Sequence, residues 1–346
     1  MEQPLLRLGL LGFAPPAADR LRTWAAQTQA GWPAWRESDP HRADAWMIDG
    51  AAVDVEGRDG LLIHHPQGSG ERLTLNRVEV DRPLAFATPL PEGFASAEFF
   101  DAADEHSVRQ RLQRFEAWLR PLRTQFALGG RLIEQLPVFK RGVVHVLHDG
   151  RLLAVVDLER WQAGLYIPAR PVDVAMAEWV RRPELAREIP PGFMRLPLQR
   201  ILWIYTVRTE RDLLPARYRQ QVIHLRRVPR LPVRWFDDLH LLLMNELLAQ
   251  PGTLAELEAR TARPAAELSR YLGALYYAGG LTTDADSARR ALAETRRDVL
   301  ALQFEQTDQV QDALARDSGL SEQPPSSILR GAGHSPLRAV VDRKAV

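Results

Sequence analysis

Eight arginines lie between Tyr205 and Trp235, where Glu210 and Asp212 are the only acidic residues, so this stretch carries six surplus positive charges. A guanidinium group offers a planar fork of donors that fits phosphate, and it also stacks on aromatic rings. We therefore expect the stretch to bind an anion, either a nucleic-acid backbone or a compact nucleotide such as a cyclic dinucleotide. The candidate ligand- or phosphate-binding residues are Arg208, Arg217, Arg219, Arg226, Arg227, Arg230 and Arg234.

A second interpretation of this stretch stays open. Lysine occurs only at Lys140 and Lys344, so arginine is the usual basic residue of the chain. The segment 236–284 carries seven acids against three arginines, a net charge of −4, and its carboxylates could pair with the upstream guanidinium groups. Arg226 and Arg230 have the spacing of the arginine pair in PilZ domains, but the companion Asp-x-Ser-x-x-Gly strand does not follow.

The residue patterns that usually carry catalysis or bind metal are missing. The chain has no cysteine, which excludes thiolate nucleophiles, disulfides and cysteine-ligated metals. His145 and His148 are three residues apart in an expected strand, so their side chains point to opposite faces. No Gly-x-Ser-x-Gly sequence is present, and Gly9-x-x-Gly12 lacks the third glycine and the lysine of phosphate loops. We expect a protein without a catalytic centre, metal or cofactor.

The first 95 residues have the pattern of a small α/β domain. Short apolar runs alternate with Gly, Pro and Asp, which is typical of buried strands separated by turns. Pro15-Pro16 marks the start of a helix that extends to about Gln29. The expected strands are 5–13, a short one near Trp35, 43–50, 61–63, 73–80 and 84–88.

Residues 96–185 predict a helical segment followed by a β-meander. Apolar residues at 108, 112, 115, 119, 122 and 126 alternate in steps of four and three, and Pro121 predicts a kink or two abutting helices. This seam either packs on its own domain or forms a homodimer. Asp149-Gly150, between two β-rich runs, predicts a tight hairpin. A third strand at 165–167 and a helix at 172–180 complete the expected domain.

Residues 186–285 predict a helix from Pro197 to Arg211, a basic segment with a strand at 222–225, and then three helices. Thr253 and Glu256 have the spacing of a capping box at the start of the second of these helices. Gly279-Gly280 ends the third, and a strand is expected at 281–283. Beyond it we expect a polar helix at 289–314 and a disordered tail at 318–346.

The segment 239–283 resembles a winged helix-turn-helix domain in its hydrophobic spacing, its turn residues and the Gly-Gly-Leu-Thr that would open a wing hairpin. The resemblance implies contact with DNA or a protein through the third helix. The exposed face of that helix offers Arg263, Arg270 and Tyr277 as DNA- or partner-binding residues. Because the segment has a net charge of −4, a protein-docking role is the alternative to DNA binding.

The N-terminal 95 residues resemble a response-regulator receiver domain. A buried strand ends at Asp49, where receivers carry the phosphorylated aspartate, and Leu84–Pro89 resembles their last strand with its residue–proline step. The sequence departs from the family where an acidic pair would hold magnesium, since Leu10-Leu11-Gly12-Phe13 stands there, and Thr88 takes the place of the family lysine. The resemblance therefore implies a pseudo-receiver, in which Asp49 caps a turn.

Taken together, these patterns predict a multi-domain protein of α/β plus α+β class: a receiver-like domain (1–95), a helical segment plus β-meander domain (96–185), a basic segment with a winged-helix-like domain (186–285) and a helix with a tail (286–346). We expect a cytoplasmic, non-catalytic regulatory or signalling protein that binds a protein partner or DNA and does not enter a membrane. The alternative is a receptor for an anionic nucleotide second messenger.

Overall fold

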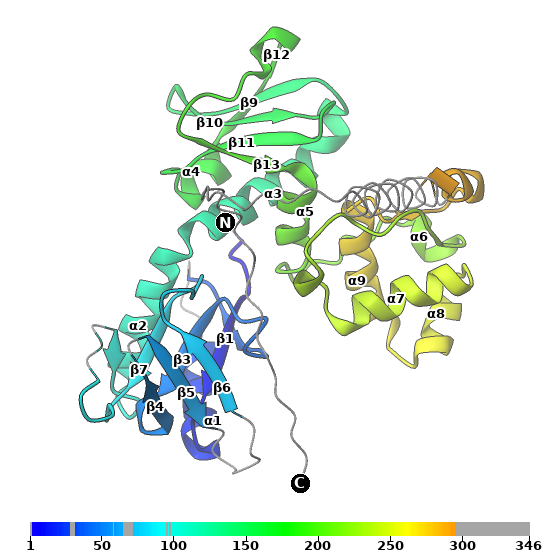
Figure 1. Ribbon diagram of the computed structural model, residues 1–346. Coiled ribbons are helices and arrows are strands. Elements are labelled where there is room, and N and C mark those ends of the chain that lie inside the picture. The colour runs from blue at the N-terminus through cyan, green and yellow to red at the C-terminus, as the bar shows by residue number, and fades with distance from the viewer. Residues whose placement is uncertain are drawn as a thin grey trace, which may run out of the picture.

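The computed structural model describes residues 2–27, 32–57, 59–64, 72–94, 96, 98–291 and 293–294, and of Arg234 the backbone. Its elements gather into three groups around separate apolar clusters (Figure 1). We call them the N-terminal unit (2–119), the meander unit (120–206) and the C-terminal module (207–284). The mixed α/β class expected from the sequence is confirmed.

The N-terminal unit is built on a five-stranded parallel sheet of order β2-β1-β3-β7-β8. Both faces of this sheet are covered, which is why its strands are continuously apolar. Two helices pack on one face, where Met47 belongs to their shared core, and Ile48 on the other face packs under a small antiparallel sheet. The elements are β1 (Leu6–Leu11), α1 (Pro15–Ala26), β2 (Trp35–Glu37), β3 (Ala45–Asp49), the 3₁₀ turn η1 (Gly50–Ala52), β4 (Val53–Glu56), β5 (Gly60–His64), β6 (Arg72–Asn76), β7 (Leu84–Ala87), β8 (Phe99–Phe100) and α2 (Glu105–Trp118).

The sequence pattern located most of these strands but missed β4 and β8. The receiver resemblance had suggested that Leu84–Pro89 forms the last strand of the sheet. The structure places β8 outside β7 (Leu84–Ala87), so β7 is the fourth of the five strands in spatial order. Between η1 and β7 the chain forms the sheet β4-β5-β6, in agreement with the short strands expected there.

The apolar seam from 108 to 126 lies on two abutting helices, which confirms the break expected near Pro121: α2 ends at Trp118 and α3 (Arg120–Phe139) begins two residues later. Val108, Leu112 and Phe115 pack in the core of the N-terminal unit, and Phe126 packs on the meander unit. The seam is thus buried within the chain and leaves no free face for the alternative of a homodimer.

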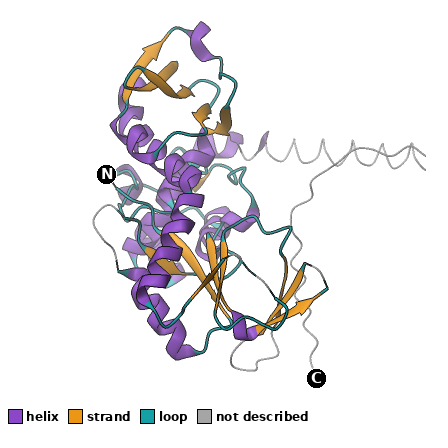
Figure 2. Cartoon of the chain, turned by 90° about the vertical axis from the view of Figure 1, so that its left-hand side faces the viewer, coloured by secondary structure: helices purple, strands orange, loops and turns teal. Residues whose placement is uncertain are grey.

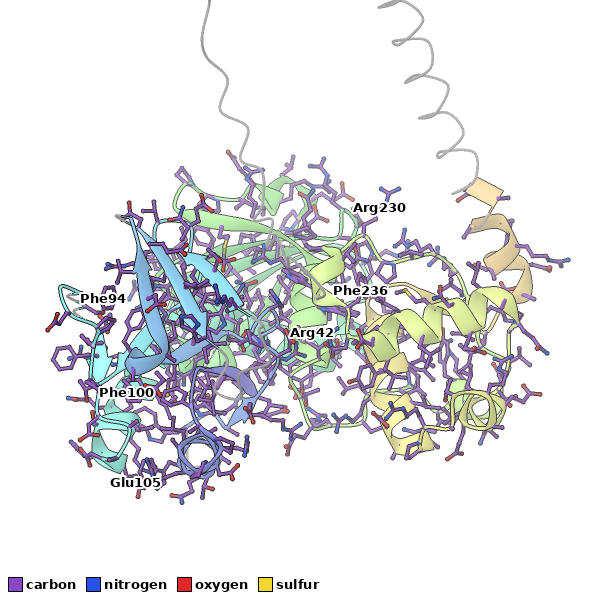
Figure 3. All side chains as sticks on the ribbon, turned by 60° about the horizontal axis from the view of Figure 1, so that its bottom comes forward. Arg42, Phe94, Phe100, Glu105, Arg230 and Phe236 are labelled. Carbon is purple, nitrogen blue, oxygen red and sulfur yellow. The ribbon has the colours of Figure 1, made fainter. Side chains whose placement is uncertain are left out.

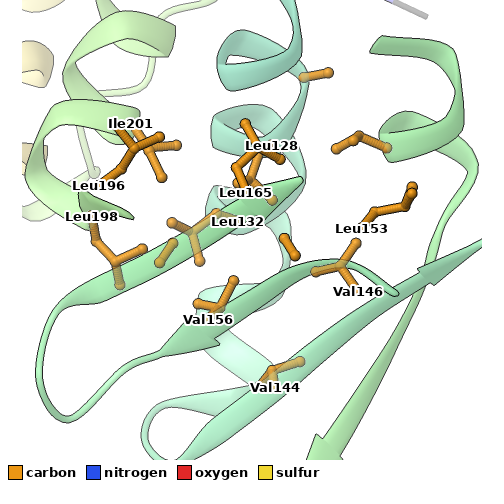
Figure 4. Close-up of a cluster of buried hydrophobic side chains, with 14 of the residues drawn as sticks. Leu128, Leu132, Val144, Val146, Leu153, Val156, Leu165, Leu196, Leu198 and Ile201 are labelled. Carbon is orange, nitrogen blue, oxygen red and sulfur yellow. The ribbon is translucent and has the colours of Figure 1, made fainter. Parts of the chain in front are cut away.

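The meander unit is an antiparallel sheet of order β12-β9-β10-β11-β13 with helices on one face. Asp149 and Gly150 have positive φ values of 48° and 73°, which confirms the predicted tight hairpin. Figure 4 shows side chains from the strands and from the helices that cover them meeting in the core. The elements are β9 (Val143–His148), β10 (Arg151–Asp157), β11 (Gln162–Tyr166), α4 (Pro171–Met176), β12 (Glu178–Arg182), the 3₁₀ turn η2 (Glu184–Arg187), β13 (Phe193–Pro197) and α5 (Leu198–Thr206).

Two predictions fail in this unit. The helix expected at 172–180 ends at Met176, because residues 178–182 pair with the open edge of β9. Tertiary hydrogen bonds override the local helical pattern there. The helix expected from Pro197 to Arg211 ends at Thr206. Helix α5 packs tightly on α3, since a Cβ added at Gly129 would lie only 2.8 Å from the Ile201 carbonyl oxygen.

The C-terminal module contains the three expected helices, and the capping box at Thr253 and Glu256 is confirmed by hydrogen bonds of 3.3 and 2.7 Å. The prediction of a wing hairpin after the third helix is wrong. Strand β15 pairs antiparallel with β14, which precedes the helices, and residues 285–291 continue as helix. The elements are α6 (Arg217–Gln220), β14 (His224–Leu225), the 3₁₀ turn η3 (Val233–Trp235), α7 (Asp238–Ala249), α8 (Leu254–Thr261), α9 (Ala265–Tyr277) and β15 (Leu281–Thr282).

The buried apolar clusters divide the chain near residues 119 and 206, whereas the sequence had predicted domain limits at 95 and 185. Residues 99–119 belong to the N-terminal core. Leu198, Ile201 and Leu202 of α5 belong to the meander core, while Trp203 of the same helix packs in the core of the C-terminal module. Figure 2 shows the helices that lie between the two main sheets. The tail expected at 318–346, and the helix expected at 289–314 beyond residue 294, lie outside the described residues.

Candidate functional site

Arg208, the first of the predicted anion-binding arginines, contacts a carboxylate of the N-terminal unit. Its Nη1 and Nη2 atoms each lie 2.6 Å from an oxygen of Asp44, and Nη1 also donates to the Leu5 carbonyl oxygen at 3.0 Å. The Arg208 and Asp44 side chains are only 10% and 9% exposed. Both arms of the guanidinium fork are therefore occupied by an internal partner, but this partner belongs to the N-terminal unit and not to the acids of 236–284 that the second interpretation named.

Further ion pairs connect the N-terminal unit to the start of α7. Arg42 lies 3.2 Å from an oxygen of Asp237 and 2.7 Å from one of Asp238, and Arg7 lies 3.5 Å from Asp237. Figure 3 labels Arg42 at the boundary between the N-terminal unit and the C-terminal module. We call Arg7, Arg42, Asp44, Arg208 and Asp237 the junction network. Burial lowers the pKa of Arg7, and the nearby charge of Arg208 lowers it further.

His240 lies beneath this network with an imidazole that is 2% exposed. The Asp237 backbone N–H donates to its Nδ1 at 3.1 Å, so the side chain completes the capping box of α7. The ring packs against those of Trp203 and Tyr271. Burial lowers the pKa of His240 to about 3, and the charges of Arg7 and Arg42 contribute to the shift. The imidazole is therefore neutral at physiological pH.

Two more predicted arginines interact within the C-terminal module. Arg219 forms an ion pair with Asp212, which also accepts a hydrogen bond from Ser269 at 3.0 Å. Arg217 stacks over the ring of Tyr218, with its Cζ 5.1 Å from the ring centroid. Neither side chain lies beside Arg208, so the arginine stretch as a whole does not converge on one pocket.

Arg226, Arg227 and Arg230 differ from the others, and we call them the basic cluster. All three are exposed, directly after β14, and within the described residues none has a carboxylate partner. Figure 3 labels Arg230 on the outside of the molecule. Partial burial lowers the pKa of Arg227, and the charges of Arg226 and Arg230 lower it further. The three guanidinium groups are thus close enough to repel one another. Of Arg234, the seventh candidate, no side chain is described.

Of the three candidates expected on the third helix, Arg263 precedes α9, and Arg270 and Tyr277 of α9 do not share one open face. Arg263 and Arg270 are exposed, but they line a groove of about 380 Å³ whose opposite wall belongs to the N-terminal unit and includes Arg36 and Asp39. Tyr277 packs against the core of the meander unit, and burial raises its pKa. Arg270 on α9 and Arg263 just before it therefore line the same groove as residues of the N-terminal unit.

Asp49 acts as a cap in the structure. Its Oδ1 accepts a hydrogen bond of 3.1 Å from the Ala51 backbone N–H, at the start of η1. This is the turn-capping role expected for it. His145 and His148 do not act together either, since Nε2 of His145 lies 2.8 Å from the Ala186 carbonyl oxygen while His148 lies near Asp173. Among the described residues, no three potential ligands of the types His, Cys, Asp and Glu come together to hold a metal ion.

Sequence reasoning missed the junction network apart from Arg208. Arg7, Arg42 and Asp44 lie on the N-terminal unit, about 200 residues from Asp237 along the chain, and no local motif connects them. The one available signal was the charge imbalance, which left open that acids after residue 236 pair with the upstream arginine stretch. Asp237 and Asp238 pair instead with Arg7 and Arg42 of the N-terminal unit.

Comparison with known proteins gives no identification: no family model matches the sequence, and neither a curated protein nor a solved structure shows significant similarity to it. None of the helices in the described part of the chain has the length and apolar character that crossing a bilayer requires.

Proposed function

We propose that this chain is a non-catalytic regulatory protein whose C-terminal module recognises the acidic surface of a protein partner through Arg226, Arg227 and Arg230. The observation that carries the proposal is the basic cluster: three neighbouring exposed guanidinium groups that have no carboxylate partner in the described residues. The other arginines of the stretch whose side chains are described, Arg208, Arg211, Arg217 and Arg219, have internal partners, so an unpaired group of three is the exception that calls for an external anion.

The surroundings of the cluster favour a protein partner. Val228 and Val233, in the same segment, are 57% and 76% exposed. Arginine together with exposed apolar side chains is typical of protein interfaces, where arginine is enriched and lysine is depleted. The segment therefore combines the charge that orients an acidic partner with apolar surface that gains from being buried.

DNA is the less favoured partner for three physical reasons. The segment 236–284 carries a net charge of −4, which a phosphate backbone repels. Strand β15 is paired with β14, so no following wing hairpin is formed among the described residues. Arg263 and Arg270 line a groove together with residues of the N-terminal unit, so a duplex that approached α9 would meet that unit.

The junction network supports a regulatory arrangement. Arg42 of the N-terminal unit pairs with Asp237 and Asp238 at the start of α7, so the position of the receiver-like unit is coupled to the module that carries the basic cluster. Asp49 caps a turn, and the chain lacks the acidic pair that holds magnesium in receivers. We therefore assign the N-terminal unit a positioning role and no phosphoryl transfer.

The cyclic-dinucleotide alternative has less support at its original residues. A compact anion needs arginines that converge, whereas Arg208 and Arg219 each pair with a different aspartate. The basic cluster is open to solvent, which suits a broad acidic surface better than an enclosed ligand.

The experiment that tests the proposal measures binding of two labelled polyanions, poly-L-glutamate and a 20-base-pair duplex, by fluorescence anisotropy. We expect the acidic polypeptide to bind and the affinity to fall with salt, because exposed charges are screened. Tighter binding of the duplex, lost together with the three arginines, would replace the protein partner with a nucleic acid. If the substitution Arg226→Gln, Arg227→Gln, Arg230→Gln changes neither interaction, the proposal is wrong.

A further inference from the structure

Strand β12 (Glu178–Arg182) is an outer strand of the meander sheet. Figure 1 shows it at the top of the meander unit, on the side away from the other two units. Its backbone pairs antiparallel with β9, and the described residues offer no backbone partner on its other side. Every second residue of such a strand turns its N–H and C=O groups outward, so another strand can pair there. We call this open side the β12 edge.

The sequence of the β12 edge complements that of a second copy placed antiparallel to it. A two-fold axis through Val180 sets Glu178 of each copy opposite Arg182 of the other. Opposite charges that face each other across paired strands stabilise the pairing. The same axis sets Trp179 opposite Arg181, so no like charges meet. Each end of the paired strands would therefore carry one attractive contact.

The two charged residues are available for this contact. Glu178 and Arg182 are both exposed, and neither forms an ion pair within the described residues. Side chains alternate along a strand, so both lie on the same face as Val180, whereas Trp179 packs against the meander core on the other face. The two charges can therefore meet across the axis without giving up a partner in their own chain.

The opposite edge of the same sheet lacks this complementarity. It belongs to β13, whose middle residue is Arg195. A two-fold axis at that residue would set Arg195 opposite its own copy, and like charges in this position are destabilising. Pro197, at the end of the strand, has no N–H to donate. Charge complementarity therefore favours the β12 edge as the surface for self-association.

Exposed apolar residues lie at both ends of the β12 edge. Met176, at the end of α4, is 69% exposed, and Leu185, in η2, is 96% exposed. In an antiparallel pair the residues before β12 in one copy approach the residues after β12 in the other. Pairing would thus bring Met176 of one copy towards Leu185 of the other and remove apolar surface from water.

We propose that the chain forms a symmetric dimer in which two β12 strands pair antiparallel about Val180 and join the two meander sheets into one. This surface is distinct from the apolar seam from 108 to 126, which is buried within the chain. The dimer does not depend on the proposed function, because the basic cluster belongs to the C-terminal module and each copy keeps its own.

Sedimentation equilibrium of the full chain measures the dissociation constant of the dimer. Each substitution counts twice in a symmetric dimer, so Arg182→Glu, which sets two acidic groups face to face, should weaken dimerisation about tenfold or more. Glu178→Arg should have a similar effect. Arg151→Glu is the matched control, since Arg151 is also exposed but lies on β10, an inner strand of the same sheet, and it should change the constant by about twofold at most.

The exchange of both charges provides the sharpest result. Glu178→Arg combined with Arg182→Glu restores opposite charges across the axis and should return the dissociation constant to within about threefold of wild type. The two residues lie about 13 Å apart along one strand, so they cannot pair within a chain, and the recovery reports a contact between copies. Circular dichroism of each variant checks that the fold is kept.

Three outcomes would overturn the proposal. A wild type that stays monomeric at about 100 µM leaves the β12 edge to a strand of another protein. A combined variant that associates no more tightly than its single variants removes the pairing of Glu178 with Arg182. Equal weakening by Arg151→Glu and Arg182→Glu shows that net charge, rather than the edge, governs association.

Discussion

Replacing Asp44 by asparagine tests the junction network directly. The Asp44 carboxylate accepts two hydrogen bonds from Arg208 and a third, of 2.8 Å, from the Arg7 backbone N–H. Asp44→Asn removes the negative charge but nearly keeps the shape. It leaves Arg208 buried without a counter-charge and next to Arg7, whose pKa its charge already lowers.

The expected loss follows from burial. Removing one member of a buried ion pair costs about 3–5 kcal/mol, because the other charge stays desolvated. The side chains of Arg208 and Asp44 are about 90% buried, so this range applies to the free energy of unfolding. Adding Arg208→Gln to Asp44→Asn should recover part of the loss, since the stranded charge is then removed as well.

Equilibrium urea unfolding, followed by circular dichroism and by tryptophan fluorescence, provides the measurement. Asp54→Asn is the control, because Asp54 pairs with His64 at the surface and is 67% exposed, so its loss should cost about 1 kcal/mol or less. Equal losses for Asp44→Asn and Asp54→Asn, or a double variant as unstable as the sum of its single variants, would refute the reasoning.

Three further predictions concern stability. Because the pKa of His240 is about 3 in the folded protein, below its ordinary 6.5, the unfolded chain binds the proton first as pH falls. The free energy of unfolding should therefore drop between about pH 6.5 and pH 3, by roughly 5 kcal/mol at most. His240→Gln, which can still complete the capping box, should remove this component; an unchanged pH profile of urea unfolding would contradict the assignment. Thr253→Ala should cost about 1 kcal/mol by removing the cap of α8, and a thermal midpoint equal to that of wild type would count against it. Gly129→Ala should destabilise by about 1–3 kcal/mol, because the added Cβ would lie 2.7 Å from Tyr205 Cβ; undiminished stability in urea would show that α3 and α5 can separate.

Local features of the fold could be predicted because short sequences determine them. Asp149-Gly150 predicts the hairpin since both positions need positive φ, and Thr253 with Glu256 predicts the cap of α8 since both bonds form within four residues. The apolar steps from Val108 to Phe126 predicted helices, and Pro121 predicted the break between them.

The predictions that failed concern features that depend on contacts between segments far apart in the sequence. The helix expected at 172–180 stops at Met176 because residues 178–182 form a strand that pairs with β9, and β15 pairs with β14 rather than with a strand that follows it. The candidate site shows the same limit. Arginine richness indicated an anion-binding stretch, but only the fold separates Arg208, which Asp44 neutralises, from Arg226, Arg227 and Arg230, which stay unpaired in the described residues.

The most direct test of the proposed function reverses the charge of the basic cluster. The dissociation constant of labelled poly-L-glutamate is compared between wild type, a variant with Arg226→Glu, Arg227→Glu and Arg230→Glu, and a control with Arg72→Glu, Arg151→Glu and Arg195→Glu. The control arginines are also exposed and lie on β6, β10 and β13, so both variants change the net charge equally.

Three exposed ion pairs contribute about 1–3 kcal/mol together, so the cluster variant should bind at least about tenfold more weakly than wild type at low salt. The control should stay within about twofold to threefold of wild type. Equal weakening in both variants would mean that net charge alone attracts the polyanion, and it would contradict recognition by the basic cluster.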